Sequence, residues 1–215
     1  MSTISTTENR TLMVQARESL KEKWGLAVGT FFVYMLIISA ITWIAQALFG
    51  DESEIGALII TIIDGPFSLG LAIFALSLSR NQDAKLTQIF EGFQKFGVAF
   101  AAYILQLIFV LLWMILLIIP GIIAAISYSQ TFYIIADDDS IGPLQAIKKS
   151  KEMMMGNKWK YVCLGLRFIG WILLCILTLG IGLLWLIPYM SISYAKFYDD
   201  ISGKEVIVEE TQIDT

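Results

Sequence analysis

The feature that most constrains this chain is a junction that occurs three times. A basic amphipathic segment ends in a lysine and an aromatic residue and then continues into a long apolar stretch, at Lys23-Trp24, Lys95-Phe96 and Lys158-Trp159. Each stretch is long enough to cross a bilayer, which takes about 20 apolar residues. Basic and aromatic side chains mark the ends of such spans. The junctions therefore predict a membrane protein whose chain enters the bilayer three times from the same side.

The overall composition agrees with this interpretation. Of the 215 residues, 57% are hydrophobic and 16% are charged, whereas a soluble domain is about 45–50% apolar and about 25% charged. The sequence lacks the basic stripe outside membrane spans that nucleic-acid binding requires. It also has no histidine, which is the commonest metal ligand and the usual acid–base group near neutral pH. We therefore predict no nucleic-acid partner, no metal site and no cofactor.

The pattern of apolar and basic segments predicts an all-α, polytopic membrane domain over residues 10–200. It divides into three units, at residues 10–79, 80–136 and 137–200, and each opens with a basic amphipathic helix expected to lie along the membrane interface. Residues 1–9 are rich in serine and threonine and are predicted to be disordered. Residues 201–215 form an acidic C-terminal tail.

The number of spans depends on two long apolar stretches, residues 97–135 and 161–195. A helix over the first would be about 58 Å long at about 1.5 Å per residue, against a hydrocarbon core of about 30 Å. A hairpin in each stretch, with turns near residues 118–122 and 178–182, also places nearly all Lys and Arg on one side. The positive-inside rule makes that side cytoplasmic. We therefore expect six spans as three hairpins in a cell membrane, with both termini cytoplasmic; four spans are the alternative.

The second and third units also resemble each other. A shift of 61 positions aligns identical residues: Gly121 with Gly182, Tyr128 with Tyr189, Tyr133 with Tyr194, and Asp138-Asp139 with Asp199-Asp200. This weak internal repeat favours a duplication. All three units run in the same direction, unlike the inverted repeats of many secondary transporters.

Two charged residues lie inside apolar stretches, and such residues are candidates for function. Asp64 precedes Gly65-Pro66, where the proline frees a backbone carbonyl, so the site would suit a proton or a cation. Alternatively, Asp64 lies in a wet outer vestibule or hydrogen-bonds a neighbouring span. We expect Arg167 to snorkel to the cytoplasmic interface. Helical side chains lean toward the helix N-terminus, so Asp64 leans outward, Arg167 leans inward, and we do not expect them to pair.

The inner ends of the predicted fourth and sixth spans carry polar groups. The candidates for function among them are Tyr128, Gln130, Tyr133, Tyr189, Ser193 and Tyr194. Hydroxyl and amide groups at such positions either join helices by interhelical hydrogen bonds or line a cavity open to the cytoplasm.

Signatures of catalysis are missing from the sequence. It has no Gly-x-Ser-x-Gly elbow, no phosphate-binding Gly-Lys-Ser/Thr loop and no histidine for a triad. The acidic groups Asp137–Asp139 and Asp199-Asp200 are expected to end one helix and cap the next rather than to bind a cation. We therefore predict that the protein is not an enzyme.

Several motifs resemble a bacterial integral membrane family known only as the domain-of-unknown-function 975 family. They are Leu116–Ile123, Tyr128-Ser129, Ala146–Met154, Phe168–Trp171, Leu177–Gly182, Trp185–Tyr189 and Tyr194–Tyr198. The resemblance covers roughly residues 10–200 and implies a bacterial cell-membrane protein. It brings no catalytic residues with it. A fainter similarity is to the membrane part of certain glycerophosphodiester phosphodiesterases, which does not include their catalytic domain.

These observations lead us to expect a non-enzymatic accessory or scaffold component. It would bind anionic lipid of the cytoplasmic leaflet, a protein partner or a second copy of itself. Each Lys or Arg near such a leaflet contributes about 1 kcal/mol. The alternative is a small transporter or permease component that uses Asp64 and a polar cavity facing the cytoplasm.

Overall fold

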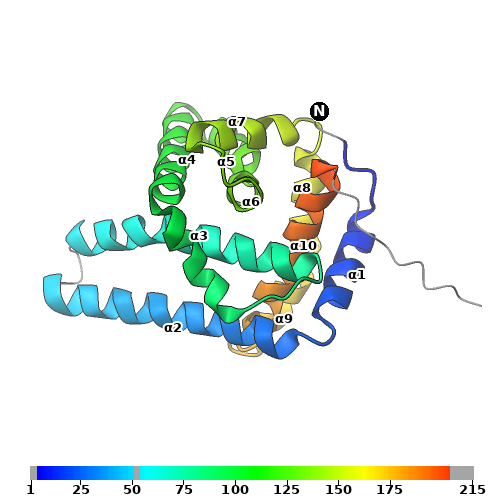
Figure 1. Cartoon of the computed structure of the whole chain (residues 1–215), viewed down its shortest axis with the longest axis horizontal. Helices are drawn as coiled ribbons and strands as arrows, with labels where there is room; N and C mark the ends of the chain where they lie inside the picture. The colour runs from blue at the N-terminus through cyan, green and yellow to red at the C-terminus, as the bar shows by residue number, and fades with distance from the viewer. Residues whose placement is uncertain (1–3, 51–53, 204–215) are drawn as a thin grey trace, which may run out of the picture.

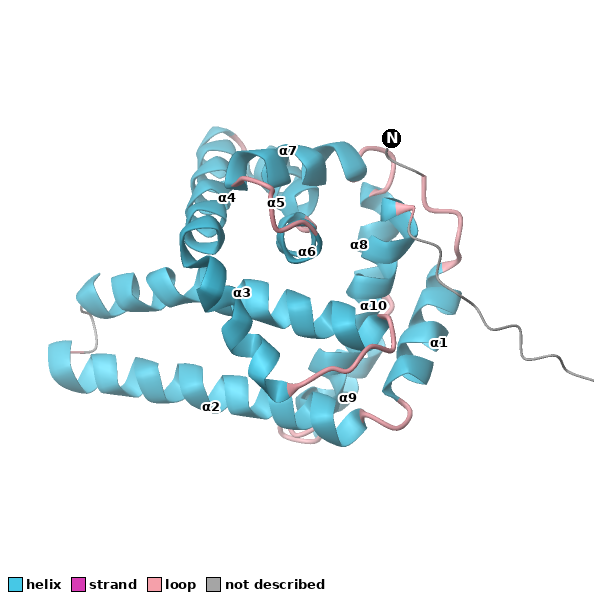
Figure 2. Cartoon of the chain, in the orientation of Figure 1, coloured by secondary structure: helices cyan, strands magenta, loops and turns pink. Residues whose placement is uncertain are grey.

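The computed structural model describes residues 4–50 and 54–203, and within these ranges it contains helices and no strand (Figure 2). The all-α prediction is therefore confirmed. The elements are α1 (Asn9–Leu20), α2 (Trp24–Phe49), α3 (Glu54–Ser79), the 3₁₀ helix η1 (Leu86–Lys95), α4 (Phe96–Leu116), α5 (Ile118–Tyr128), α6 (Thr131–Asp137), α7 (Pro143–Met153), α8 (Lys158–Leu166), α9 (Ile169–Leu177) and α10 (Leu183–Ser202).

Five helical segments in the described part of the chain are long and apolar enough to cross a membrane. They are Trp24–Phe49, Glu54–Ser79, Leu86–Leu116, Ile118–Asp137 and Lys158–Leu177. The prediction of a helical membrane protein is thus confirmed. α10 differs from these segments because its second half carries Lys196, Asp199 and Asp200.

α2 and α3 lie side by side and antiparallel (Figure 1). The ring of Phe31 contacts that of Phe74 at a centroid distance of 6.3 Å, and Tyr34 contacts Phe67 at 5.6 Å. Residue numbers thus rise along one helix as they fall along the other. Residues 51–53, which connect the two helices, lie outside the described residues.

The two long apolar stretches also fold back on themselves instead of forming single long helices. In the first, the chain is extended at Leu117, and Phe109 of α4 contacts Tyr128 of α5 at 6.2 Å. In the second, Leu179 and Gly180 adopt positive φ angles of 52° and 87°. The antiparallel arms there meet through two ring pairs, Tyr161 with Tyr194 at 4.7 Å and Phe168 with Tyr189 at 5.3 Å.

The same close approach occurs at both of these turns. A Cβ atom added to Gly121 would lie 2.2 Å from Cγ of Met114, and one added to Gly182 would lie 2.7 Å from Sγ of Cys175. Each glycine thus faces the residue seven positions before it, and the 61-residue shift relates the two pairs. This shared contact supports the duplication that the sequence suggests.

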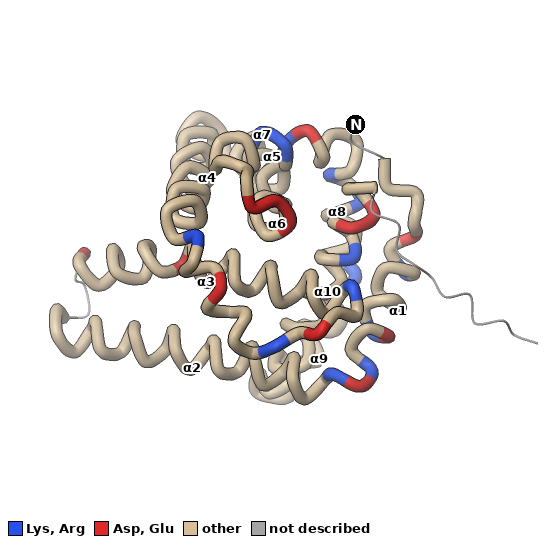
Figure 3. Tube along the Cα trace, viewed as in Figure 1, with Lys and Arg blue, Asp and Glu red and all other residues tan. Residues whose placement is uncertain are grey.

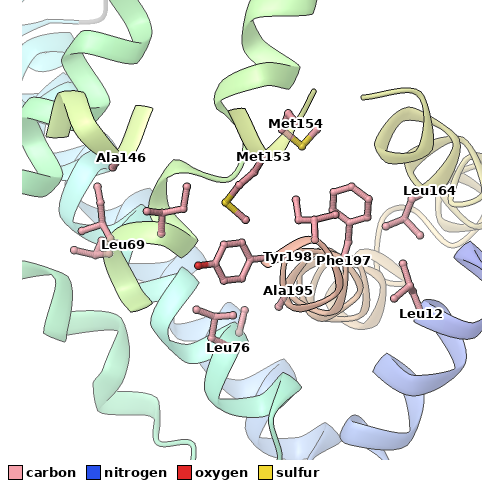
Figure 4. Close-up of a cluster of buried hydrophobic side chains, with 14 of the residues drawn as sticks. Leu12, Leu69, Leu76, Ala146, Met153, Met154, Leu164, Ala195, Phe197 and Tyr198 are labelled. Atoms are coloured by element: carbon pink, nitrogen blue, oxygen red, sulfur yellow. The ribbon is translucent and has the colours of Figure 1, made fainter. Parts of the chain in front are cut away.

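The buried core lies at the basic ends of the helix pairs, and their turn ends are exposed. In α4, Ala99 and Ala102 near its start are fully buried, whereas residues 111–119 around the turn are all exposed. The core joins α1, α7, α8 and α10, whose side chains meet around Phe197 and Tyr198 (Figure 4). The exposed apolar turn ends are the surface expected to face lipid.

The basic amphipathic helices α1 and α7 pack their apolar faces on the rest of the protein. Leu12, Ala16 and Leu20 of α1 are fully buried within the protein. Ile147 of α7 is likewise buried in a cluster with residues of α4 and α5. These apolar faces thus pack on the spans, and the position of the helices along the membrane interface stays a prediction. The basic faces are left pointing outward.

η1 crosses α3 with its backbone in direct contact. A Cβ atom added to Gly92 would lie 1.9 Å from the carbonyl oxygen of Pro66, and one added to Gly70 would lie 2.1 Å from that of Ile89. Glycine at both positions is what permits this approach. The contact fixes where the second helix pair starts relative to the first.

The N-terminal segment also requires a correction. The Ser5 N–H donates to Oδ1 of Asn157 at 2.9 Å, and the hydroxyls of Ser5 and Thr7 donate to the carboxylate of Asp200. Residues 4–8 are therefore held against α8 and α10 rather than disordered, because their hydroxyls find a partly buried carboxylate. Residues 1–3 lie outside the described residues. So does most of the predicted acidic tail, since α10 continues to Ser202 and residues 204–215 are not described.

Candidate functional site

A charged cluster lies where α3, α6 and α10 end. The Arg80 guanidinium, directly after α3, donates to both carboxylate oxygens of Asp137 at 2.6 and 3.1 Å. It also donates to Oδ1 of Asp199, through Nε at 3.0 Å and Nη2 at 2.7 Å. One residue thus joins the final helices of all three sequence units.

Further side chains complete this cluster. The Ser79 hydroxyl donates to Asp199 at 2.9 Å, and the Tyr198 hydroxyl donates to Asp137 at 2.9 Å. The Lys196 ammonium donates to the Ser79 carbonyl at the C-terminus of α3, where a cation is favourable because of the helix dipole. Two carboxylates therefore face two cations.

Burial makes these pairings necessary. Asp199 and Lys196 are buried, and the side chain of Arg80 is 23% exposed. Burial by itself disfavours the charged guanidinium, but the hydrogen bonds to Asp137 and Asp199 outweigh it and raise the pKa of Arg80. Charges in such a place are tolerated only when they are paired and hydrogen-bonded. Asp137 ends α6, as expected, but both Asp137 and Asp199 also bind Arg80, a role that we did not predict.

The sequence contained a signal for this cluster that we did not use. Arg80 directly follows α3, Asp137 ends α6 and Asp199 lies in the last turn of α10, and charges of opposite sign near the ends of three neighbouring helices can meet. The neighbouring Asp138 does act locally, accepting hydrogen bonds from the backbone and hydroxyl of Ser140, which lower the pKa of Asp138.

Asp64 lies at a contact between α3 and its neighbours. The Tyr103 hydroxyl of α4 donates to Oδ2 of Asp64 at 3.1 Å, and Tyr34 of α2 is close enough to interact with it electrostatically. A Cβ atom on Gly65 would lie 2.8 Å from the Ala99 carbonyl oxygen, so the missing side chain lets α4 approach. Asp64 thus forms an interhelical hydrogen bond, one of the alternatives considered above.

The polar ends of the predicted fourth and sixth spans are largely buried and bonded to backbone carbonyls. The Ser193 hydroxyl donates to the Tyr189 carbonyl at 2.8 Å. The Tyr133 hydroxyl donates to the Ser191 carbonyl at 3.3 Å, and that of Tyr189 to the Met13 carbonyl at 3.2 Å. The two tyrosine hydrogen bonds join α6 and α1 to α10, whereas the Ser193 bond lies within α10.

Tyr128, Gln130 and Tyr194 lie in the same region. Tyr128 and Gln130 are buried on either side of the break between α5 and α6. The hydroxyl of Ser150, from α7, accepts the Gln130 N–H at 3.2 Å and donates to the Ser127 carbonyl at 2.8 Å, which bridges this break. Tyr194 packs on Tyr161 of α8.

Arg167 lies apart from the other predicted site residues. It follows the last residue of α8 and is exposed, and its side chain has no hydrogen bond or ion pair in the described part of the chain. Within the same ranges, no group of three or more His, Cys, Asp or Glu residues could hold a metal ion.

Lysines are concentrated on α7, which also carries Glu152 near its end (Figure 3), and we call their exposed side chains the basic surface. Lys148, Lys149 and Lys151 are exposed on α7. After this helix, Met155 is 58% and Trp159 73% exposed. Cationic and large apolar side chains are thus displayed together.

One known protein family matches most of the chain. The family described as "Protein of unknown function (DUF975)" matches residues 1–127 and 107–205. The chain belongs to this family. Its description gives no activity, so the DUF975 match assigns no role to the charged cluster or to the basic surface. No curated protein and no solved structure matches the chain. The similarity to the membrane part of glycerophosphodiester phosphodiesterases stays a prediction.

Proposed function

We propose that this protein is a non-enzymatic component of the cell membrane that binds anionic lipid headgroups through its cytoplasmic face. The proposal rests mainly on the way α7 packs against the protein. Its apolar face, including Ala146, Ile147 and Met153, is buried in the protein, while its lysines point outward. A helix held in this way cannot insert its apolar face into lipid, and it presents charge instead.

The lysines of α7 are available to an external anion. The side chains of Lys148, Lys149 and Lys151 have no ion pair or hydrogen bond within residues 4–50 and 54–203. Met155 and Trp159, beside Lys158, add exposed apolar and aromatic surface of the kind found at the lipid boundary. Each lysine near an anionic leaflet contributes about 1 kcal/mol, and salt screens this attraction.

The alternative of a permease component finds less support. It requires Asp64 and the polar ends of the fourth and sixth spans to share a path. In the described chain no hydrogen bond joins Asp64 to those groups, and Tyr133, Tyr189 and Ser193 already donate to backbone carbonyls. These contacts favour a packing role for the polar ends.

The lipid-binding proposal predicts a change on neutralising α7. Replacing Lys148, Lys149 and Lys151 together with glutamine should lower the enrichment of anionic over zwitterionic lipid around the protein on the order of a hundredfold at low salt, or about 3 kcal/mol. Mass spectrometry of lipids retained in nanodiscs of mixed composition measures this enrichment at low and high salt. The matched triple replacement with arginine should retain it. Equal enrichment in both triple variants would overturn the proposal.

The proposal also includes six crossings with both termini inside, the sixth by the apolar first part of α10. Lys149→Cys and Leu179→Cys, each in a background with Cys163 and Cys175 replaced by alanine, test it. Both positions are exposed, so labelling reports on location. A membrane-impermeant maleimide added to intact cells should label position 179 and should label position 149 only after permeabilisation. Labelling of both positions from the same side would rule out the six-span topology.

A further inference from the structure

Arg167 is an unpaired cation on the exposed side of an apolar helix. It lies between α8 and α9, inside the candidate span Lys158–Leu177. Its side chain is exposed and has no partner among the residues that the structure describes. An isolated charge in apolar surroundings is costly. Its guanidinium is therefore available to an anion outside the chain.

The contact between α8 and α10 indicates how far Arg167 lies along the helix axis from the charged end of the domain. Lys160 of α8 forms an ion pair with Asp200 of α10 at 3.6 Å, and this pair marks the charged end of the domain. Arg167 is seven residues further along, or about 10 Å at about 1.5 Å per residue. Its long side chain leans back toward the helix N-terminus, and therefore toward the charged end of the domain. This brings the guanidinium close to the boundary where lipid headgroups lie.

Two exposed tryptophans flank this position. Trp159 lies eight residues before Arg167 and Trp171 four residues after it, and Trp171 is 54% exposed. The backbone stays in the αR region at Arg167 and Phe168, between α8 and α9, so at 3.6 residues per turn these spacings place the three side chains within about 120° of one another. Gly170 is exposed as well, and a Cβ atom added there would meet no atom within 4 Å. The stripe thus has a cationic centre, aromatic ends and free space between them.

We propose that Arg167 binds the phosphate group of an inner-leaflet phospholipid seated between Trp159 and Trp171. A guanidinium forms two parallel hydrogen bonds to phosphate, which makes this a strong and directional pair. Lys160 does not compete for the lipid because Asp200 and Ser5 already hold it. The inference rests on the cytoplasmic orientation in the proposed function but concerns different chemistry. α7 responds to net negative charge, whereas Arg167 recognises the phosphate that anionic and zwitterionic phospholipids share.

Quenching of Trp171 fluorescence by brominated lipid tests this site directly. In a variant that keeps Trp171 and has the other five tryptophans replaced by phenylalanine, we compare brominated phosphatidylglycerol, phosphatidylcholine and diacylglycerol in nanodiscs. Both phospholipids should be preferred over the phosphate-free lipid. Arg167→Gln should reduce that preference about tenfold, and Arg167→Lys should reduce it less. An unchanged preference in Arg167→Gln would overturn the proposal.

Controls separate this site from the surface of α7. Lys149→Gln changes an exposed cation on another helix and should leave the Trp171 quenching unchanged. The triple glutamine variant of α7 should lose anionic enrichment while Trp171 keeps its preference for phospholipid. Mass spectrometry of the protein with its native tryptophans gives a second measurement. Arg167→Gln should retain one phospholipid fewer than the parent protein in mild detergent, and equal retention would count against the site.

Discussion

Replacing Arg80 with glutamine is expected to destabilise the protein by about 3 kcal/mol. The change leaves the carboxylates of Asp137 and Asp199 without their main partner, and both are at most 11% exposed. We place the effect at the low end for a broken buried pair because the side chain of Arg80 is itself 23% exposed. Tryptophan fluorescence during thermal or SDS unfolding in detergent measures the loss.

Two further variants test whether the effect comes from unpaired buried charge. Lys85 pairs with Asp83 at 3.0 Å, but these side chains are 66% and 83% exposed, so Lys85→Gln should leave the unfolding midpoint unchanged. Replacing Asp137 and Asp199 with asparagine in the Arg80→Gln background removes the stranded charges and should recover part of the stability. If Arg80→Gln unfolds like the parent protein, the cluster does not hold the three units together.

Gly92→Ala should have an effect of similar size for a steric reason. The added methyl group would lie 1.9 Å from the Pro66 carbonyl oxygen, and that atom belongs to a backbone that cannot move aside alone. η1 must therefore separate from α3, which we expect to cost at least about 2 kcal/mol, as for other overpacked sites. The same unfolding measurements apply, with the yield of folded protein as a second readout.

Gly97→Ala is the matched control for Gly92→Ala. Gly97 lies in the first turn of α4, and a Cβ atom there would meet nothing within 4 Å. Because alanine favours the helix over glycine by up to about 1 kcal/mol, this variant should be as stable as the parent protein or slightly more so. Equal destabilisation of both variants would show that the contact between η1 and α3 is not the cause.

The helical membrane class could be predicted because it depends on local properties. A long apolar run such as 97–135 must be helical in lipid, and its length against the bilayer required it to fold back. The contact of Phe109 with Tyr128 has the antiparallel arrangement that this argument predicts. The glycine pair Gly121 and Gly182 was visible as a sequence repeat, and its shared close contact could be described only once the turns had a geometry.

The arrangement of the charged groups could not be predicted in the same way. Pairing of Arg80 with Asp137 and Asp199 joins residues 57 and 119 positions apart, so it depends on how the helix pairs pack. The apolar face of α1 illustrates the same limit. Its spacing identifies Ala16 and Leu20 as buried, but whether lipid or protein covers them is decided by the surface that the hairpin ends offer. Asp64 likewise gained a partner, Tyr103, from another hairpin.

The placement of the core at one end of the helix pairs has a consequence for membranes of different thickness. Helices adapt to a thinner or thicker bilayer mainly by tilting. The exposed turn ends around residues 111–119 have few buried neighbours to lose, while the cluster around Arg80 remains closed at the other end. The helix pairs can therefore change their tilt about a fixed base, and the charged cluster can keep its contacts as the thickness of the surrounding lipid varies.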